Sequence, residues 1–273
     1  MTAAASAPIG VFDSGLGGLT VLRELLARLP NERFLYLGDT ARLPYGSKSP
    51  ETIRRYVEQN VDFLVKRGVK AVVVACNSAS SALRPDDRWP VPVYEVIGPG
   101  TRAAVAATQS RRVAVFATRA TVAGGAYAIR MRAAAPGITV VQEACPLLVP
   151  FVEEGMVDDP VTSEMVRRYM GGVLGGPGPE VDTLILGCTH YPLLEPLFRR
   201  LLGPGIALVD SGRSLSVEVA AEIAAGRLPA APQGGPHPRV ELLVTDVSDR
   251  TDELAARFLA PHRASPARLV DLG

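Results

Sequence analysis

Short runs of aliphatic and β-branched residues recur along the chain and alternate with stretches of helical periodicity. The apolar runs lie at 9–12, 33–38, 69–75, 91–96, 112–117, 138–143, 183–187, 206–210 and 239–244. The stretches with helical periodicity lie at 19–29, 50–68, 160–174 and 213–226. Strands that are apolar on both faces and alternate with helices are typical of parallel sheets covered by helices. The sequence therefore predicts the α/β class with parallel sheets.

Two pairs of segments within the chain resemble each other. The stretch "IGVFDSGLGGLTV", from residue 9, resembles "VAVFATRATVAGGAY", from residue 113. The stretch "AVVVACNSAS", from residue 71, resembles "TLILGCTHYP", from residue 183. A repeat of two long units favours two similar α/β halves rather than a solenoid.

The charge balance and the thiol content exclude several classes of protein. Lys and Arg number 29 against 28 Asp and Glu, so no electrostatic feature indicates binding to nucleic acid or to a membrane surface. No apolar run approaches the roughly 20 residues of a membrane span, and the start "MTAAASAPIGVF" lacks the features of a signal peptide. Three cysteines at no zinc-finger spacing are typical of reduced thiols. We expect a cytoplasmic protein with a small-molecule partner.

Two of the cysteines follow apolar runs at equivalent points of the repeat. Cys76 lies between "VVVA" and "NSAS", and Cys188 lies between "LILG" and "THYP". A buried core position is the common alternative for a free cysteine, and we assign it to Cys145 in "EACPLLVP". For Cys76 and Cys188 the repeated context favours chemistry, because a helix start after the strand stabilises a thiolate.

Two thiols that face each other across a cleft suit the inversion of a stereocentre. One thiolate removes a proton from carbon, and the opposed thiol delivers a proton to the other face. Each thiol needs a neighbour that manages its proton. Asp13 and Ser14 in "FDSGLGG", His190 beside Cys188, and Glu153 in "VPFVEEG" are candidates. A turn residue is the alternative for Asp13, and a loop histidine is the alternative for His190.

The sequence carries no motif for a cofactor or a metal. The stretch "GLGGLT" at 15–20 lacks the third glycine of the dinucleotide fingerprint, and no P-loop pattern is present. We interpret its glycines as a tight turn whose amides can approach a small anion. Cys76, Cys188 and His190 would offer a metal only three ligands, none at helix spacing. We therefore expect a reaction without cofactor or metal.

Five motifs resemble those of bacterial glutamate racemases, in the cofactor-independent aspartate/glutamate racemase family. They are "FDSGLGG", "LGDTARLPYG", "ACNSAS", "CPLLVPFVE" and "GCTHYP", and the similarity extends from about residue 9 to 226. Aspartate and hydantoin racemases share the plan of two cysteines but generally lack "GCTHYP" and "PYG" together. The resemblance implies a cofactor-independent interconversion of L- and D-glutamate that supplies D-glutamate for the peptidoglycan of the cell wall.

The resemblance also implies roles for individual residues. Cys76 and Cys188 become the two acid/base groups, with Asp13 and His190 as their main helpers and Asp39 and Glu153 as lesser ones. The implied substrate contacts are Asp13, Ser14, Tyr45, Gly46, Asn77, Ser78, Thr189 and His190. The family usually has Thr where this chain has Ser78, and the hydroxyl is retained. Of the five motifs only "LGDTARLPYG" contains Lys or Arg, so we expect hydroxyls and amides to hold a dicarboxylate.

The resemblance divides the chain into two α/β domains with the active site in the cleft between them. Residues 1–97 and 209–273 form one domain, and residues 98–208 form the other. The oligomeric state stays open, with a homodimer among the expectations.

Three other functions stay open at this point. A related racemase would act on aspartate. A cysteine hydrolase would use Cys188 as nucleophile and His190 as base, although Cys76 would then have no role. A binding protein would close on an amino acid without exchanging its Cα hydrogen with solvent.

Overall fold

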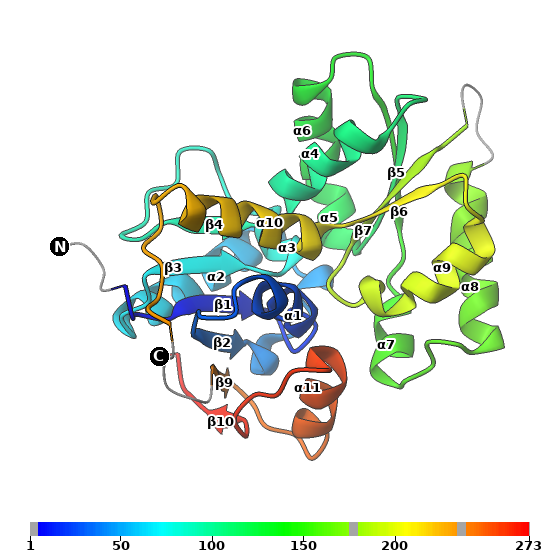
Figure 1. The fold of residues 1–273 in the computed structure, drawn as a ribbon. Helices are drawn as coiled ribbons and strands as arrows, with labels where there is room; N and C mark the ends of the chain where they lie inside the picture. Colours follow the sequence, from blue (N-terminus) through cyan, green and yellow to red (C-terminus); the bar gives the residue numbers. More distant parts are fainter. Residues whose placement is uncertain (1–4, 175–179, 234–238, 273) are drawn as a thin grey trace.

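The computed structural model describes residues 5–174, 180–233 and 239–272 of the chain. This described part contains two β-sheets with helices packed against them (Figure 1). The α/β class is confirmed, and each apolar run overlaps one strand. One further strand, β10 (Arg268–Leu269), escapes the sequence analysis because two exposed residues carry no periodic signal.

The first sheet has the strand order β10-β9-β2-β1-β3-β4 in the described chain, with every pair parallel. Its other strands are β1 (Ile9–Asp13), β2 (Phe34–Gly38), β3 (Ala71–Val74), β4 (Val93–Glu95) and β9 (Val240–Val244). In the register of this sheet, Ile9 of β1 lies opposite Phe34 of β2 and Ala71 of β3. The residues of β1, β2 and β3 are all buried, as expected of strands covered on both faces.

The second sheet has the order β6-β5-β7-β8, and its pairs are also parallel. Its strands are β5 (Arg112–Ala117), β6 (Thr139–Ala144), β7 (Thr183–Gly187) and β8 (Ala207–Asp210). The first sheet contains the same arrangement, β2-β1-β3-β4, with β1 in the place of β5 and β3 in the place of β7. The internal repeat in the sequence therefore corresponds to a repeat in topology.

The helices agree with the sequence periodicity where it was clear. The expected segments become α1 (Leu19–Arg28), α2 (Pro50–Lys66), α8 (Pro160–Leu174) and α10 (Ser211–Ala224), with ends that differ by at most two residues. At the start of α2, the Ser49 side chain accepts a hydrogen bond from the Thr52 amide, as an N-cap does. The remaining α-helices of the described residues are α3 (Asn77–Ser80), α4 (Ile97–Ala107), α5 (Arg119–Gly124), α6 (Ala126–Ala134), α7 (Leu148–Glu153), α9 (Glu195–Leu202) and α11 (Thr251–Leu259). Three short 3₁₀ helices are η1 (Thr40–Arg42), η2 (Tyr45–Ser47) and η3 (Tyr191–Leu194).

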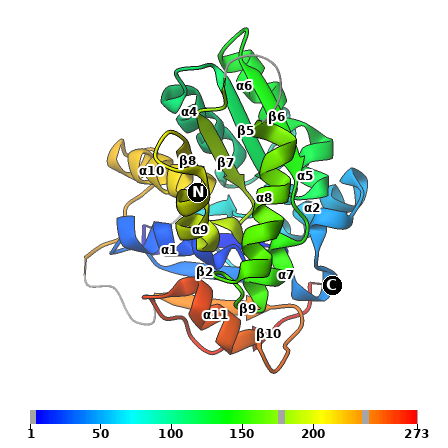
Figure 2. The same cartoon turned by 90° about the vertical axis from the view of Figure 1, so that its right-hand side faces the viewer.

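One of the three buried hydrophobic clusters among the described residues spans both sheets. The same buried cluster contains Val11 of β1, Phe116 of β5 and Leu186 of β7. Helix α10 follows β8 of the second sheet and packs against α1 and α4, as the two views of the ribbon show (Figures 1 and 2). The sheets thus divide the chain between 95 and 112 and again between 210 and 240. The domain boundaries at 97/98 and 208/209 stay a prediction.

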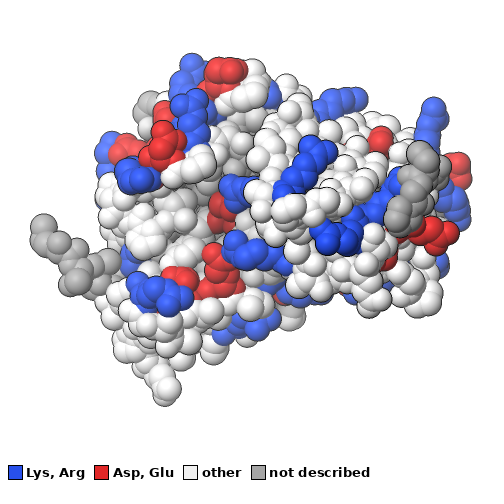
Figure 3. Space-filling view, turned by 90° about the horizontal axis from the view of Figure 1, so that it is seen from above, with Lys and Arg blue, Asp and Glu red and all other residues white. Residues whose placement is uncertain are grey.

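The surface carries mixed charge. On the face seen in Figure 3, positive and negative side chains lie beside one another in several clusters, which wide uncharged areas separate. Among the described residues, no helix is both long and apolar enough to cross a membrane.

Candidate active site

The two repeated cysteines line one cavity. Cys76 directly follows the loop residue after β3, and Cys188 follows β7, so both lie at the carboxyl ends of corresponding strands. The cavity has a volume of about 340 Å³ and takes residues from both halves of the chain. Predicted site residues that line it are Ser14, Tyr45, Gly46, Cys76, Asn77, Ser78, Glu153, Cys188, Thr189 and His190. Ligands in α/β folds commonly bind at the carboxyl ends of the strands.

A buried carboxylate influences the Cys76 thiol. Asp13 is 1% exposed at the end of β1, and its Oδ2 accepts a hydrogen bond of 3.1 Å from the Gly15 amide. Its Oδ1 is buried and has no hydrogen-bond partner within the described residues. Burial, and then the negative charge of Asp13, raise the pKa of Cys76 to about 12. Burial also raises the pKa of Asp13, against the opposing effects of His190 and the nearby amides.

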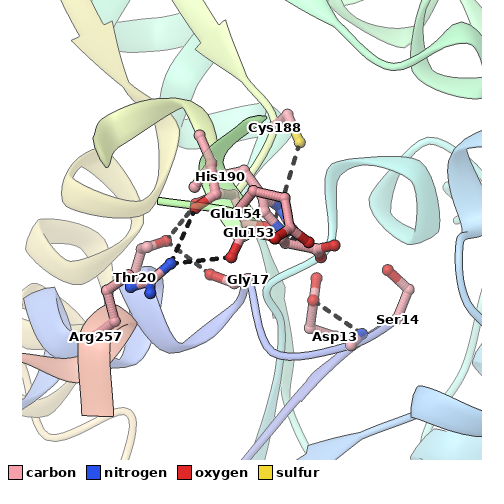
Figure 4. A network of polar contacts seen from close by, with 12 residues as sticks. Asp13, Ser14, Gly17, Thr20, Glu153, Glu154, Cys188, His190 and Arg257 are labelled. Atoms are coloured by element: carbon pink, nitrogen blue, oxygen red, sulfur yellow. Dashed lines mark hydrogen bonds and ion pairs between the residues drawn. The ribbon is translucent and has the colours of Figure 1, made fainter. Parts of the chain in front are cut away.

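Ser14 provides the second polar neighbour of Cys76. Its Oγ lies 3.7 Å from the Cys76 sulfur. Figure 4 shows Asp13 and Ser14 on the opposite side of the site from Cys188. Cys76 is therefore a protonated thiol at neutral pH, with a carboxyl group close enough to influence its proton.

A histidine and a carboxylate adjoin the Cys188 thiol. His190 Nδ1 lies 3.9 Å from the Cys188 sulfur, and His190 Nε2 lies 3.0 Å from Glu153 Oε1 (Figure 4). Burial lowers the pKa of His190, but its contacts with Cys188 and Glu153 outweigh burial and raise the pKa to about 10. Burial raises the pKa of Glu153, and the contact with His190 outweighs that and lowers it. Both shifts indicate an imidazolium paired with a carboxylate.

The glycines of "GLGG" make room for the two helpers. A Cβ atom built on Gly17 would lie 2.4 Å from the His190 ring, and one built on Gly18 would lie 2.5 Å from Asp13 Cβ. Thr20 adds a second contact between the segment after β1 and the segment after β7, because its hydroxyl donates a 2.7 Å hydrogen bond to the Thr189 carbonyl. The loop after β1 thus packs directly against the loop after β7. Gly15 in the same loop lines the cavity, so its position fits the expected approach of backbone to a ligand.

Two predicted residues do not line the cavity: Asp13, which lies behind Cys76, and Asp39. Asp39 follows β2 and is 0% exposed. Its carboxylate pairs with Arg42 at 2.7 Å and accepts hydrogen bonds from the Tyr45 hydroxyl and, at 3.1 Å, from Thr245. Of these partners of Asp39, Tyr45 is the one that lines the cavity, so within the described part of the chain Asp39 acts on the cavity by holding the Tyr45 hydroxyl.

The cavity also contains residues that the sequence analysis did not single out: Leu43, Pro44, Ser47, Thr118, Arg119, Pro146, Val149 and Pro150. Thr118 caps α5, and its hydroxyl lies 2.8 Å from the hydroxyl of Ser78. Arg119 supplies the one Lys or Arg side chain among the described residues of the lining. The repeat could have indicated both, because the loop after β5 corresponds to the loop after β1 that contains Ser14.

No metal cluster is evident in the part of the chain that the structure describes. Groups of three or more His, Cys, Asp or Glu side chains that could hold a metal ion do not occur among these residues. The polar side chains that line the cavity instead supply hydroxyls, an amide, two thiols, the Arg119 guanidinium and the His190–Glu153 pair. Such a set can bind carboxylates and move protons.

Comparison with known proteins gives the same assignment. The model of the Asp/Glu/Hydantoin racemase family matches residues 9–219. The glutamate racemase of Syntrophus aciditrophicus is 45% identical, over 92% of each chain. The glutamate racemase of Thermus thermophilus, solved with β-chloro-D-alanine, has a TM-score of 0.86 and 44% identity and covers 98% of each chain. That of Francisella tularensis, solved with D-glutamate, has a TM-score of 0.89 and 31% identity over 98% of this chain and 99% of its own. The chain therefore belongs to the Asp/Glu/Hydantoin racemase family and, within it, to the glutamate racemases, which are isomerases.

Proposed function

We propose that the chain interconverts L- and D-glutamate by moving a proton at Cα between two thiols on opposite faces of the substrate. The carrying observation is that Cys76 and Cys188 line one cavity from corresponding strands of the two sheets. Each thiol has its own partner for proton transfer, Asp13 for Cys76 and His190 for Cys188.

In the direction from L to D, the Cys188 thiolate takes the Cα proton and the Cys76 thiol gives its proton to the other face. A cation stabilises the thiolate of a neighbouring cysteine, which is the role of the His190 imidazolium. Glu153 keeps that imidazolium charged and oriented. The cycle leaves Cys188 protonated and Cys76 ionised, so a proton must return before the next turnover. The same groups with exchanged roles perform the reaction from D to L.

The polar lining supports binding of a dicarboxylate. Ser14, Ser78 and Thr189 contribute hydroxyls, and Asn77 contributes a side-chain amide. Ser78 keeps the hydroxyl of the usual threonine and uses it to contact Thr118. Arg119 at the rim adds a positive charge for an incoming anion. We propose a strong preference for glutamate over aspartate, supported by the relatives that are named glutamate racemases.

Incubation with L-glutamate in D₂O tests the proposal. We expect optical rotation to decay to zero while deuterium enters at Cα, with unchanged activity after dialysis against a chelator. Loss of activity to the chelator and recovery with metal would contradict the mechanism. Binding of glutamate without exchange at Cα would support a binding protein. Formation of an acyl-enzyme on Cys188 would support a hydrolase.

We also propose the cellular setting that the resemblance implies. The racemase would act in the cytoplasm and supply D-glutamate for peptidoglycan. Its domains would comprise residues 1–97 with 209–273 and residues 98–208, and a homodimer is its proposed assembly. Sedimentation equilibrium tests the assembly, since a single species at the mass of one chain, 28.9 kDa, would contradict the dimer.

A further inference from the structure

Among the described residues, the side-chain amide of Asn77 has a hydrogen-bond partner for its oxygen but none for its nitrogen. Asn77 is 3% exposed and lines the cavity at the start of α3. Its Oδ1 accepts a hydrogen bond of 2.7 Å from the Tyr127 hydroxyl. Its Nδ2 is buried and has no hydrogen-bond partner among the described residues. A buried amide donor without a partner is costly, so a ligand in the cavity would gain by accepting from it.

Tyr127 reaches Asn77 from the other half of the molecule. It lies on α6, is 0% exposed and does not itself line the described cavity. Its ring is held on two sides by glycines. A Cβ atom built on Gly187 would lie 3.2 Å from the ring, and one built on Gly100 would lie 3.5 Å from it. Because the ring is fully buried and a side chain at Gly187 would crowd it, the close packing around the ring restricts the position of the hydroxyl.

The two residues that Tyr127 lies against are sequence neighbours of the two thiols. Asn77 directly follows Cys76, and Gly187 directly precedes Cys188. The Tyr127 side chain therefore donates a hydrogen bond to the residue after Cys76 and lies close to the residue before Cys188. Because the contact with Asn77 crosses between the two halves, the arrangement forms only when both halves are in their folded relation.

We propose that Tyr127 is a positioning residue that fixes the orientation of the Asn77 amide, so that Nδ2 donates to a carboxylate of the bound substrate. An amide can rotate by a half-turn and present either its NH₂ group or its carbonyl oxygen. With its hydroxyl donating to Oδ1, Tyr127 selects the orientation in which the NH₂ group faces the cavity. The opposite orientation would place a partial negative charge against an anion. The identity of this anion, glutamate, rests on the function proposed above.

A double-mutant cycle tests the inference. Tyr127→Phe keeps the ring and removes the hydroxyl, and Asn77→Ala removes the amide. We expect Tyr127→Phe to raise KM about 10-fold for both enantiomers with a smaller change in kcat, because the Asn77 amide is no longer held with its donor toward the charged carboxylate. In the Asn77→Ala background, Tyr127→Phe should change KM no further, since the amide through which it acts is absent.

Tyr94→Phe is the matched control, because Tyr94 is a partly buried tyrosine on β4 and not part of the cavity lining. It should leave KM and kcat unchanged, and thermal unfolding should show that every variant is folded. Unchanged KM in Tyr127→Phe would overturn the inference. An equal rise of KM in both backgrounds would also overturn it, since Tyr127 would then act by packing alone.

The test separates this inference from the proposed function. If the wild-type chain does not racemise glutamate, the proposed function fails, and the cycle is repeated on the dissociation constant of D-glutamate by calorimetry. A loss of affinity in Tyr127→Phe that disappears in the Asn77→Ala background supports the inference in that case too. Equal losses in the two backgrounds, or no loss in either, contradict it.

Discussion

At the scale of single residues, the two thiols differ in the charge beside them. Cys76 adjoins a buried carboxylate, whereas Cys188 adjoins an imidazolium. Enantiomers have equal free energies, so the two directions of racemisation must have equal kcat/KM. The different surroundings therefore do not appear as a difference in kcat/KM between the two directions, but they do appear in reactions that stop after proton abstraction.

The first prediction uses a glutamate analogue with a leaving group at Cβ, which eliminates once its Cα proton is removed. Cys76→Ser and Cys188→Ser should each nearly abolish racemisation, because a hydroxyl is a far weaker acid and base here than a thiol. Cys76→Ser should still eliminate from the L-configured analogue and fail on the D-configured one, and Cys188→Ser should do the reverse. Product formation, followed spectroscopically, measures both. If both variants lose elimination from both enantiomers, the two thiols do not divide the work.

A second residue-scale prediction concerns the His190–Glu153 pair. Glu153→Gln removes the carboxylate that helps to raise the pKa of His190 to about 10, so this pKa should fall. The alkaline limb of the kcat–pH profile should then move by at least about one unit to lower pH, relative to the wild type. An identical alkaline limb in the two proteins would show that Glu153 does not support the imidazolium.

The same pair makes a pH-dependent contribution to stability. The pKa of His190 is higher in the folded than in the unfolded chain, so its contribution to the free energy of unfolding is complete below about pH 6.5. That contribution is lost as pH rises through about 10. The pKa of Glu153 is lowered in the folded chain, so its contribution to the free energy of unfolding is lost as pH falls through that pKa. The difference in melting temperature between wild type and Glu153→Gln should be largest near pH 6 and vanish above pH 10.

At the scale of elements, α11 and the residue before it support the end of α7, which lies in the other half of the chain. The side chains of Arg250 and Arg257 each donate a hydrogen bond of 2.9 Å to the Glu153 carbonyl, at the C-terminal end of α7. Positive groups at such an end are favourable because they meet unpaired carbonyls. Phe258 of α11 also packs edge-on against the His190 ring, with 5.3 Å between ring centroids. Helix α11 lies beyond residue 219, where the family match ends.

Arg257→Ala should consequently disturb Glu153, the partner of His190, more than Asp13, the neighbour of Cys76. We expect elimination from the L-configured analogue to slow several-fold and elimination from the D-configured analogue to change little. Arg257→Lys should recover part of the loss, because an ammonium group can still donate to the carbonyl. Arg263→Ala, at an exposed arginine on the segment after α11, is the matched control. Equal slowing of both eliminations would show a general loss of structure instead.

At the scale of the whole molecule, both thiols open onto one cavity while the third does not. Cys76 and Cys188 line the cavity, and Cys145 is 0% exposed outside it. Saturating D-glutamate should therefore protect Cys76 and Cys188 together from an alkylating reagent, and Cys145 should react only after unfolding. Mass spectrometry of the labelled peptides measures each site. Protection of one thiol alone would contradict a shared cavity.

How much of this arrangement the sequence could predict depends on the range of the contacts. Both cysteines and the strands before them were predictable, because the pattern is local and occurs twice. The place of Asp39 behind Tyr45 was not, because it depends on how the segment after β2 folds back. The contact of Tyr127 with Asn77 joins residues 50 positions apart, and no periodic pattern encodes it. The role of helix α11 could not be predicted either, since it depends on the contact of Arg257 with the Glu153 carbonyl, far away in the sequence.

The matching strand orders of the two sheets bear on the handedness of the substrate. A chain of L-amino acids cannot contain a mirror plane, yet a racemase must treat two mirror-image molecules alike. Strand β3 has the place in the first sheet that β7 has in the second, so Cys76 and Cys188 lie at corresponding points of the repeat. With one thiol for each face of Cα, as proposed above, the site can act on either enantiomer. The repeated topology thus provides, with L-amino acids alone, one base for each of two mirror-image substrates.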